Sequence, residues 1–202
     1  MTQATRLLKK GSPVLKQQCQ RVIKEFPLAS EHLDAIDTCK DELRNLTGFW
    51  KERGMSVAAT QVGFPDTPLF IMCAKKHWYT RHQYKQFQTY VNPQILEFSE
   101  ESQLLWEGCI SNDEHLCLVE RPKFVAAQWH NLKGQPVNVM LSGLVARIFQ
   151  HEVDHLNGEL MWEEVADPTR VPRRLEKMVE IGEVARDVEK FYNANREFLM
   201  EW

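Results

Sequence analysis

Residues 150–158 read Gln-His-Glu-Val-Asp-His-Leu-Asn-Gly and place two histidines four positions apart, with a glutamate directly after the first. On an α-helix, residues i and i+4 share one face, so His151 and His155 can aim their imidazoles at one point. Such a pair can bind a metal ion, and Glu152 is then placed to take a proton from water. The alternative is a pair of hydrogen-bonded core histidines, because this short pattern also occurs by chance.

The stretch 142–157 around the two histidines is predicted to be one helix, ended by Gly158. Positions i, i+4, i+7 and i+11 form one stripe along it, namely Leu144, Ile148, His151 and His155. Because this stripe is otherwise apolar, we expect both imidazoles to face the core. Asp154 lies off the stripe and should sit near solvent or behind the metal ligands.

The remaining periodicity predicts an α+β fold. A helix is expected over 30–53, with Ser30 as its N-cap and Gly54 after its end, and a C-terminal helix is expected from Thr169 onward. Short segments rich in β-branched and aromatic residues are expected to be strands, at 68–74, 89–98, 115–120, 123–129 and 137–141. Residues 131–134 read as a hairpin turn. This order predicts antiparallel or mixed sheets wrapped around a central metal-binding helix.

The composition fits one globular domain. The chain has 202 residues, of which 43% are hydrophobic and 26% charged, so we expect a single domain over 1–202 with a helical extension at 166–202. A net charge of −3 gives no reason to expect a specific nucleic-acid partner. No run approaches the roughly 20 apolar residues of a membrane helix. Five scattered cysteines favour a reducing compartment.

Two other segments can complete a metal site. A metal that keeps one position open for water needs a third protein ligand, and Cys109 offers a thiolate that suits a borderline-soft divalent cation. The alternative for Cys109 is a buried structural cysteine. The glycine-flanked loop 54–65 carries one amide, Gln61, which beside a metal would stabilise a developing oxyanion. On its own this segment is better explained as a glycine-flanked packing loop.

Taken together, the three segments resemble the motifs of the peptide deformylase family. That family has a Gly-x-Gly-x-Ala-Ala-x-Gln loop, a Glu-Gly-Cys-Leu-Ser strand and a His-Glu-x-Asp-His helix. Here they are residues 54–61 (Gly-Met-Ser-Val-Ala-Ala-Thr-Gln), 107–111 (Glu-Gly-Cys-Ile-Ser) and 151–155 (His-Glu-Val-Asp-His). The resemblance covers roughly residues 6 to 165.

The resemblance implies a hydrolase that removes the formyl group from the N-terminal methionine of nascent proteins. It implies one divalent metal ion, natively Fe2+, with Ni2+, Co2+ or Zn2+ able to replace it. The implied metal ligands are Cys109, His151 and His155. The implied catalytic groups are Glu152 as general base and then acid, with Gln61 and the backbone N–H of Ile110 holding the oxyanion. The implied substrate-binding residues are Gly54, Met55, Ser56, Glu107, Gly108, Leu144 and Ile148.

The resemblance also implies a cellular setting. Formylated nascent peptides would be the partner, with the ribosome nearby, no membrane contact and a monomeric chain. Formylated proteins are made in bacteria and in organelles. The expected compartment is therefore the cytoplasm of a bacterium, or a mitochondrion or other organelle of a eukaryote.

Two positions depart from the family pattern. Ser56 stands at the second glycine, where it would be strained if the backbone required a positive φ. Residues 112–114, Asn-Asp-Glu, replace an aliphatic residue and a proline, which predicts a looser turn and two negative charges near the substrate. We therefore expect a preference for peptides with basic residues after the methionine. A further alternative is a diverged homologue that keeps a structural metal and has lost the activity.

Two readings compete with a deformylase. A zinc peptidase built on the same His-Glu-x-x-His helix would take its third ligand downstream, from Glu164, Glu176 or Glu180. Residues 75–90 mix basic and aromatic side chains as single-strand binders do, but a long loop with a partly covered hydrophobic side is the favoured explanation.

Overall fold

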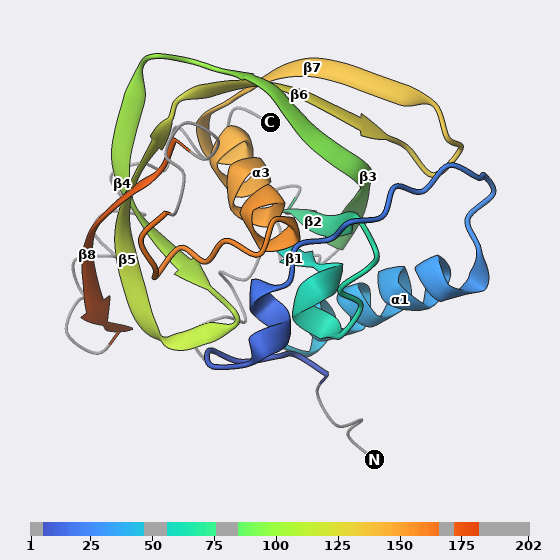
Figure 1. Ribbon diagram of the computed structural model, residues 1–202, viewed down its shortest axis with the longest axis horizontal. Helices are drawn as coiled ribbons and strands as arrows, with labels where there is room; N and C mark the ends of the chain where they lie inside the picture. The colour runs from blue at the N-terminus through green and yellow to red at the C-terminus, as the bar shows by residue number, and fades with distance from the viewer. Residues whose placement is uncertain (1–5, 47–55, 76–84, 166–171, 182–202) are drawn as a thin grey trace.

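The computed structural model describes residues 6–46, 56–75, 85–165 and 172–181, and every structural statement below concerns those residues. Two antiparallel sheets surround one central helix, α3 (Gly143–Leu156), as Figure 1 shows. A second helix, α1 (Ser30–Asn45), lies outside the first sheet. The predicted α+β fold, with a sheet wrapped around the histidine-bearing helix, is confirmed. No described helix is long and apolar enough to span a bilayer.

The first sheet has five strands in the order β1-β2-β3-β6-β7. Their bounds are β1 Ser56–Ala58, β2 Leu69–Lys75, β3 Lys85–Phe98, β6 Phe124–His130 and β7 Pro136–Ser142. The predicted hairpin turn joins β6 and β7, with Asn131 donating to the carbonyl of Gln135 and Gly134 in a left-handed conformation at φ 78°. The four segments predicted as strands in this sheet are confirmed, and β1 was not predicted.

The second sheet has three strands in the order β4-β5-β8. They are β4 (Ser102–Cys109), β5 (Asn112–Pro122) and β8 (Arg174–Glu180). The prediction of a helix is wrong over β8, because these residues pair with β5 from His115 to Glu120 and bury Val179 on the sheet. The rest of the expected C-terminal helix, residues 182–202, lies outside the described residues, as does 166–171.

Helix α3 buries one side on the first sheet. Ala146 and Phe149 are fully buried, and the ring of Phe149 meets that of Phe70 edge-on at 5.3 Å. Gly158 follows the helix with φ 75°, and a Cβ there would lie 2.5 Å from the carbonyl oxygen of Lys16. Only glycine fits both conditions, so the predicted end of this helix is confirmed.

Helix α1 packs against β2, β1 and the short 3-10 helix at Ala59–Val62. Its buried residues are Ala35, Ile36, Cys39 and Leu43, at the three- and four-residue spacing of one face. The helix begins one residue earlier than predicted, with Ala29 as N-cap, and ends at Asn45 instead of Arg53. Leu33 lies off this face and is 48% exposed.

Candidate metal centre

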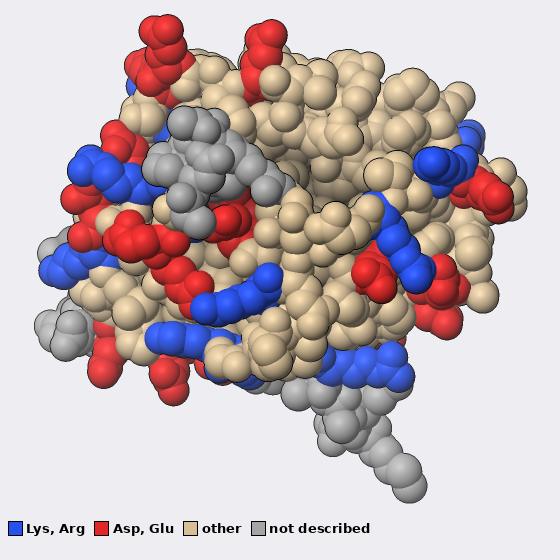
Figure 2. All heavy atoms as spheres, in the orientation of Figure 1, with Lys and Arg blue, Asp and Glu red and all other residues tan. Residues whose placement is uncertain are grey.

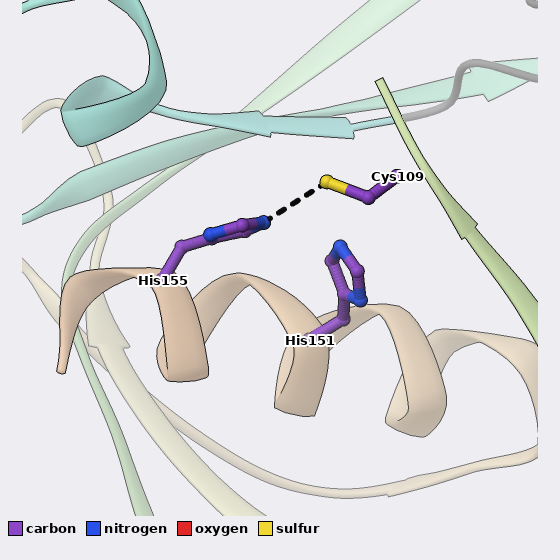
Figure 3. Close-up of side chains that lie close together, drawn as sticks. All are labelled: Cys109, His151 and His155. Atoms are coloured by element: carbon purple, nitrogen blue, oxygen red, sulfur yellow. Dashed lines mark hydrogen bonds between the residues drawn. The ribbon is translucent and has the colours of Figure 1, made fainter. Parts of the chain in front are cut away.

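Three side chains from two elements converge inside the protein. Cys109 is the last residue of β4, and His151 and His155 lie one turn apart on α3. Figure 3 shows their side chains meeting, and one ligand atom from each lies within 4.8 Å of the others. Cys109 Sγ is 3.2 Å from His155 Nε2. The predicted cysteine and histidine pair are therefore brought to one place, and both imidazoles face the interior as expected.

The end of β4 sets the position of the cysteine. The ladder between β4 and β5 shifts register between Gly108 and Cys109, so that Cys109 pairs with Asn112 across a tight turn. Such an irregularity bends the strand and re-aims one side chain. Cys109 is 3% exposed, and this turn points its sulfur at the helix.

A buried carboxylate holds the first histidine. Glu107 Oε2 lies 3.3 Å from His151 Nδ1, which leaves His151 Nε2 for a metal. Glu107 Oε1 accepts hydrogen bonds from Arg121 Nε and Arg147 Nη1, both at 2.6 Å. Burial would raise the pKa of Glu107, but the charges of Arg121 and Arg147 and its hydrogen bonds hold that pKa well below its usual value. Glu107 is thus a permanent anion behind His151.

The two histidines differ in their affinity for a proton. Burial and the charge of His151 hold the pKa of His155 well below its usual value. Burial also disfavours charge on His151, but its hydrogen bonds to Cys109 and Glu107 raise its pKa to about 10. A ligand imidazole must be neutral, so a cation competes with a proton more strongly at His151 than at His155.

Glu152 lies beside the histidines and is 1% exposed. Its Oε2 atom is buried without a hydrogen-bond partner among the described residues. Burial raises the pKa of Glu152, against the opposing effects of the His151 charge and a hydrogen bond from Ser56. A raised pKa suits a carboxyl group that must gain and lose a proton near neutral pH.

Ser56 is not strained. It lies in β1 opposite Met72. Asn92 is the non-glycine residue with positive φ in the described part of the chain, so Ser56 does not have the conformation that would demand glycine. The expected strain at this departure from the family pattern is therefore absent.

Gln61 is fixed at the site by three hydrogen bonds. Its Oε1 accepts from the backbone N–H of Ala58 at 2.8 Å. Its Nε2 donates to Ser111 Oγ at 2.9 Å and to Cys109 Sγ at 3.4 Å. The amide donor therefore faces the metal ligands from a side chain that is 1% exposed.

The other predicted catalytic residue, Ile110, occupies the turn after Cys109. It is 4% exposed, and its carbonyl accepts a hydrogen bond from Lys9 Nζ at 3.1 Å. The same lysine donates to Asp113 Oδ2 at 2.8 Å. The N-terminal segment thus ties down the turn that carries Ile110.

The residues predicted to bind substrate are placed as follows. Gly54 and Met55 lie outside the described residues. Ile148 is 9% exposed in the cluster around Phe149, and Leu144 packs partly buried against that cluster. Gly108 lies in β4, next to Glu107, whose carboxylate is taken by His151 and the two arginines. Their substrate contacts stay predictions.

Residues 112–114, which depart from the family pattern, form the beginning of β5. The expectation of a looser turn is therefore wrong. Asn112 is 1% exposed and begins β5. Asp113 forms a salt bridge with Lys9, whose hydrogen bond is the main cause that lowers the pKa of Asp113. One of the two expected negative charges is therefore compensated within the chain.

The downstream glutamates do not complete the site. Glu164, Glu176 and Glu180 are all exposed, and the last two belong to a strand instead of a helix. Cys109 is the third residue that groups with the histidines in the described part of the chain. These glutamates are therefore not third ligands, and the peptidase prediction fails on this point. Of the stretch 75–90, residues 76–84 lie outside the described residues and 85–90 begin β3.

Three buried arginines were not predicted. Arg121, Arg147 and Arg173 surround Glu107 and Asp154 behind α3. Asp154 is 5% exposed and paired with two of them, which settles its position behind the ligands rather than at the surface. A signal for Arg147 exists in the sequence, because it lies one turn before His151 on a helix that is otherwise apolar there. A cavity of about 260 Å³ borders this network on the side of α3 away from the ligands.

The donor set fits a divalent cation. One thiolate and two imidazoles suit a borderline-soft metal, and three protein ligands leave a position open. The partnerless Glu152 Oε2 is a buried polar atom that such a position would explain. The ligand atoms already lie close together, so little rearrangement is needed to bind an ion.

Comparisons with known proteins agree with this arrangement. The family model described as polypeptide deformylase matches residues 4–171. A peptide deformylase of Thermotoga petrophila is 31% identical over 180 residues, which is 89% of this chain and 96% of that protein. The class I type b peptide deformylase of Acinetobacter baumannii, solved with Met-Ala-Ser bound, is 30% identical with a TM-score of 0.65, over 82% of this chain and 100% of the other.

A crystal structure of the Thermotoga maritima peptide deformylase also matches, at 28% identity and a TM-score of 0.65, over 82% of this chain and 99% of that one. The family match covers most of the chain and includes Cys109, Glu152 and both histidines. With its fold and its cysteine–histidine cluster, this chain belongs to the peptide deformylases, metal-dependent enzymes that remove formyl groups.

Proposed function

We propose that Cys109, His151 and His155 hold one divalent cation, and that the protein uses it to remove the formyl group from N-terminal formyl-methionine. The observation that carries this proposal is the convergence of three ligand atoms within 4.8 Å beside the buried, partnerless Oε2 of Glu152. Fe2+ is the native ion that the family resemblance implies, and Ni2+, Co2+ and Zn2+ accept the same donors.

The cation, when bound, would polarise the formyl carbonyl and make water nucleophilic at neutral pH. Glu152 takes the proton that the attacking water loses and passes it to the departing amine nitrogen. The C–N bond breaks, and the products are formate and a free N-terminal amine. Burial raises the pKa of Glu152, which favours its second role as the acid that returns the proton.

Gln61 and Ile110 supply the expected oxyanion donors. The amide of Gln61 is held by Ala58 and Ser111, and its second Nε2 hydrogen, which donates to Cys109 Sγ, is the one that would turn to the oxyanion. Lys9 donates to the carbonyl of Ile110 and so restrains the turn that carries the Ile110 N–H. Each preorganised donor of this kind is worth roughly 3 kcal/mol in the transition state.

The proposed substrate is a formylated nascent peptide. The Acinetobacter relative was solved with Met-Ala-Ser, the peptide that deformylation of formyl-Met-Ala-Ser would leave. Leu144 and Ile148, with Met55, are the proposed lining for the methionine side chain. We also infer a preference for basic residues after the methionine. This inference rests on Glu114 alone, which is exposed, since Lys9 already compensates the charge of Asp113.

The proposed setting follows from the substrate. Formylated chains are made in the bacterial cytoplasm and in mitochondria and other organelles, and the enzyme would act there as a monomer close to the ribosome. Basic and acidic side chains are interspersed on the face that Figure 2 shows, which gives no reason to propose a specific nucleic-acid partner.

The test is formate release from formyl-Met-Ala-Ser by protein loaded anaerobically with Fe2+ or with Ni2+. Glu152→Gln keeps the size of the side chain and removes its base, so it serves as the control. Release by the wild type and its loss in the variant are expected. A full equivalent of bound metal with no formate from any formylated peptide would favour the diverged homologue without activity.

A further inference from the structure

We propose that Arg173 is a positioning residue for both histidines of the metal site, although it lies just beyond residues 4–171, which the family model matches. The proposal rests on the proposed metal site. Arg173 precedes β8, whose pairing with β5 anchors its backbone beside the sheet that carries Cys109, as Figure 1 shows.

The guanidinium of Arg173 is enclosed by the chain that leaves α3. Its side chain is 1% exposed. Nη1 donates to the carbonyls of Glu163 at 3.1 Å and Met161 at 3.3 Å, and Nη2 donates to the carbonyl of Leu160 at 3.1 Å. Nε lies 3.3 Å from Asp154 Oδ2 as an ion pair without hydrogen-bond geometry. The planar guanidinium therefore joins three backbone carbonyls to one carboxylate of α3.

One path from Arg173 leads to His151. The same oxygen of Asp154 accepts a hydrogen bond from Arg121 Nη1 at 2.8 Å. Arg121 Nε and Nη2 hold both oxygens of Glu107, at 2.6 and 3.1 Å. Glu107 contacts His151 Nδ1. Each member of this chain is buried, so a displacement at Arg173 is transmitted through strong, weakly screened interactions.

A second path leads to His155. The segment 160–163 that Arg173 fixes carries Trp162, which is 8% exposed and whose ring centre lies 6.4 Å from that of His155. Leu160, Met161 and Trp162 also belong to the apolar cluster that contains Cys109. The carbonyl contacts of Arg173 thus set the packing against two of the three ligands.

The two paths start at one side chain and end at different ligands, which distinguishes positioning from a general contribution to stability. Lysine at 173 would keep the charge but cannot reach Asp154 and three carbonyls together, because its ammonium is a single point on a flexible stem. Arg174 offers a matched control. It is the next residue, it carries the same group, and its side chain is 65% exposed with partners Glu120 and Glu176.

The experiment compares the full-length wild type with Arg173→Lys, Arg173→Met and Arg174→Lys. The first readout is metal affinity, measured by competition with a chromophoric chelator. The second is the visible absorption of the Co2+-loaded protein, whose bands report the geometry of the ligands. The third is kcat and KM for formyl-Met-Ala-Ser, and far-UV circular dichroism checks folding.

We expect Arg173→Lys to fold, to bind metal about tenfold more weakly and to shift the Co2+ bands, with a larger change in Arg173→Met. Arg174→Lys should match the wild type. Wild-type affinity and bands in both Arg173 variants would overturn the proposal, as would a failure of both to fold, which would make Arg173 a residue of global stability. Failure of the wild type itself to bind metal would instead refute the proposed metal site.

Discussion

Replacing Glu107 by glutamine removes a carboxylate that pairs with two buried arginines and contacts a proposed metal ligand. The wild-type carboxylate accepts hydrogen bonds from Arg121 Nε and Nη2 and from Arg147 Nη1, and lies 3.3 Å from His151. Glutamine keeps the volume but has one acceptor oxygen and no charge. Arg121 then keeps only Asp154, and Arg147 keeps the carbonyls of neighbouring strands.

The loss of unfolding free energy expected for Glu107→Gln follows from these contacts. Breaking a buried ion pair by removing one partner costs about 3–5 kcal/mol, and the surviving partners of both arginines place Glu107→Gln near 3 kcal/mol. Loss of the carboxylate behind a ligand histidine should also weaken metal binding about 10- to 100-fold. The two effects have different origins and are measured separately, by urea unfolding of the metal-free protein and by chelator competition.

Lowering the pH should reduce the difference in unfolding free energy between the wild type and Glu107→Gln. Burial alone would raise the pKa of Glu107, but the charges of Arg121 and Arg147 hold it well below its ordinary value of 4.5. Its carboxylate therefore stabilises the folded state fully above pH 4.5, and this contribution is lost as the pH falls below 4.5 toward the folded pKa. The gap in unfolding free energy between wild type and Glu107→Gln should shrink over that range.

Glu120→Gln is the matched control, because Glu120 lies on the same sheet but pairs with Arg174 and Ser102 at the surface. We expect less than about 1 kcal/mol from it. If Glu107→Gln costs no more than Glu120→Gln and binds metal like the wild type, the reasoning about this buried network is wrong.

Three further predictions concern the site. Gln61→Glu keeps an acceptor for the Ala58 N–H but loses the amide donor, so kcat for formate release should fall about 100- to 1000-fold with folding intact, and an unchanged kcat would exclude the oxyanion role. Lys9→Met removes the contact with the Ile110 carbonyl, so it should lower kcat several-fold while unfolding free energy changes by less than about 1 kcal/mol. Metal at 100 times its Kd should add about 2.7 kcal/mol to unfolding free energy, and Cys109→Ser should abolish that gain in thermal unfolding.

The sequence was most informative where local pattern and chemistry coincide. The stripe through Ile148 and His155 predicted both the central helix and the inward direction of its imidazoles, because helical spacing fixes which residues share a face. The hairpin turn at 131–134 was equally predictable from its composition. Cys109 could be proposed as a ligand from its chemistry, but its meeting with the histidines depends on the shifted ladder at the end of β4.

The wrong predictions concern residues whose structure depends on partners that are distant in the sequence. In 174–180, Leu175 and Val179 are compatible with helical as well as alternating spacing, and only pairing with β5 makes this segment a strand. The ion pairs of Glu107 with Arg121 and Arg147 join residues 14 and 40 positions apart, a separation that no local pattern encodes. The prediction of an uncompensated charge at Asp113 was wrong for the same reason, since its partner Lys9 comes from a distant part of the sequence.

The proposed ligand set is tested most directly by X-ray absorption spectroscopy of the metal-loaded protein, beside Cys109→Ser. The account predicts one sulfur neighbour and two imidazole nitrogens, at about 2.3 and 2.0–2.1 Å for zinc, with the sulfur lost in the variant. A metal shell without sulfur, or one unchanged by Cys109→Ser, would show that Cys109, His151 and His155 do not together hold the ion.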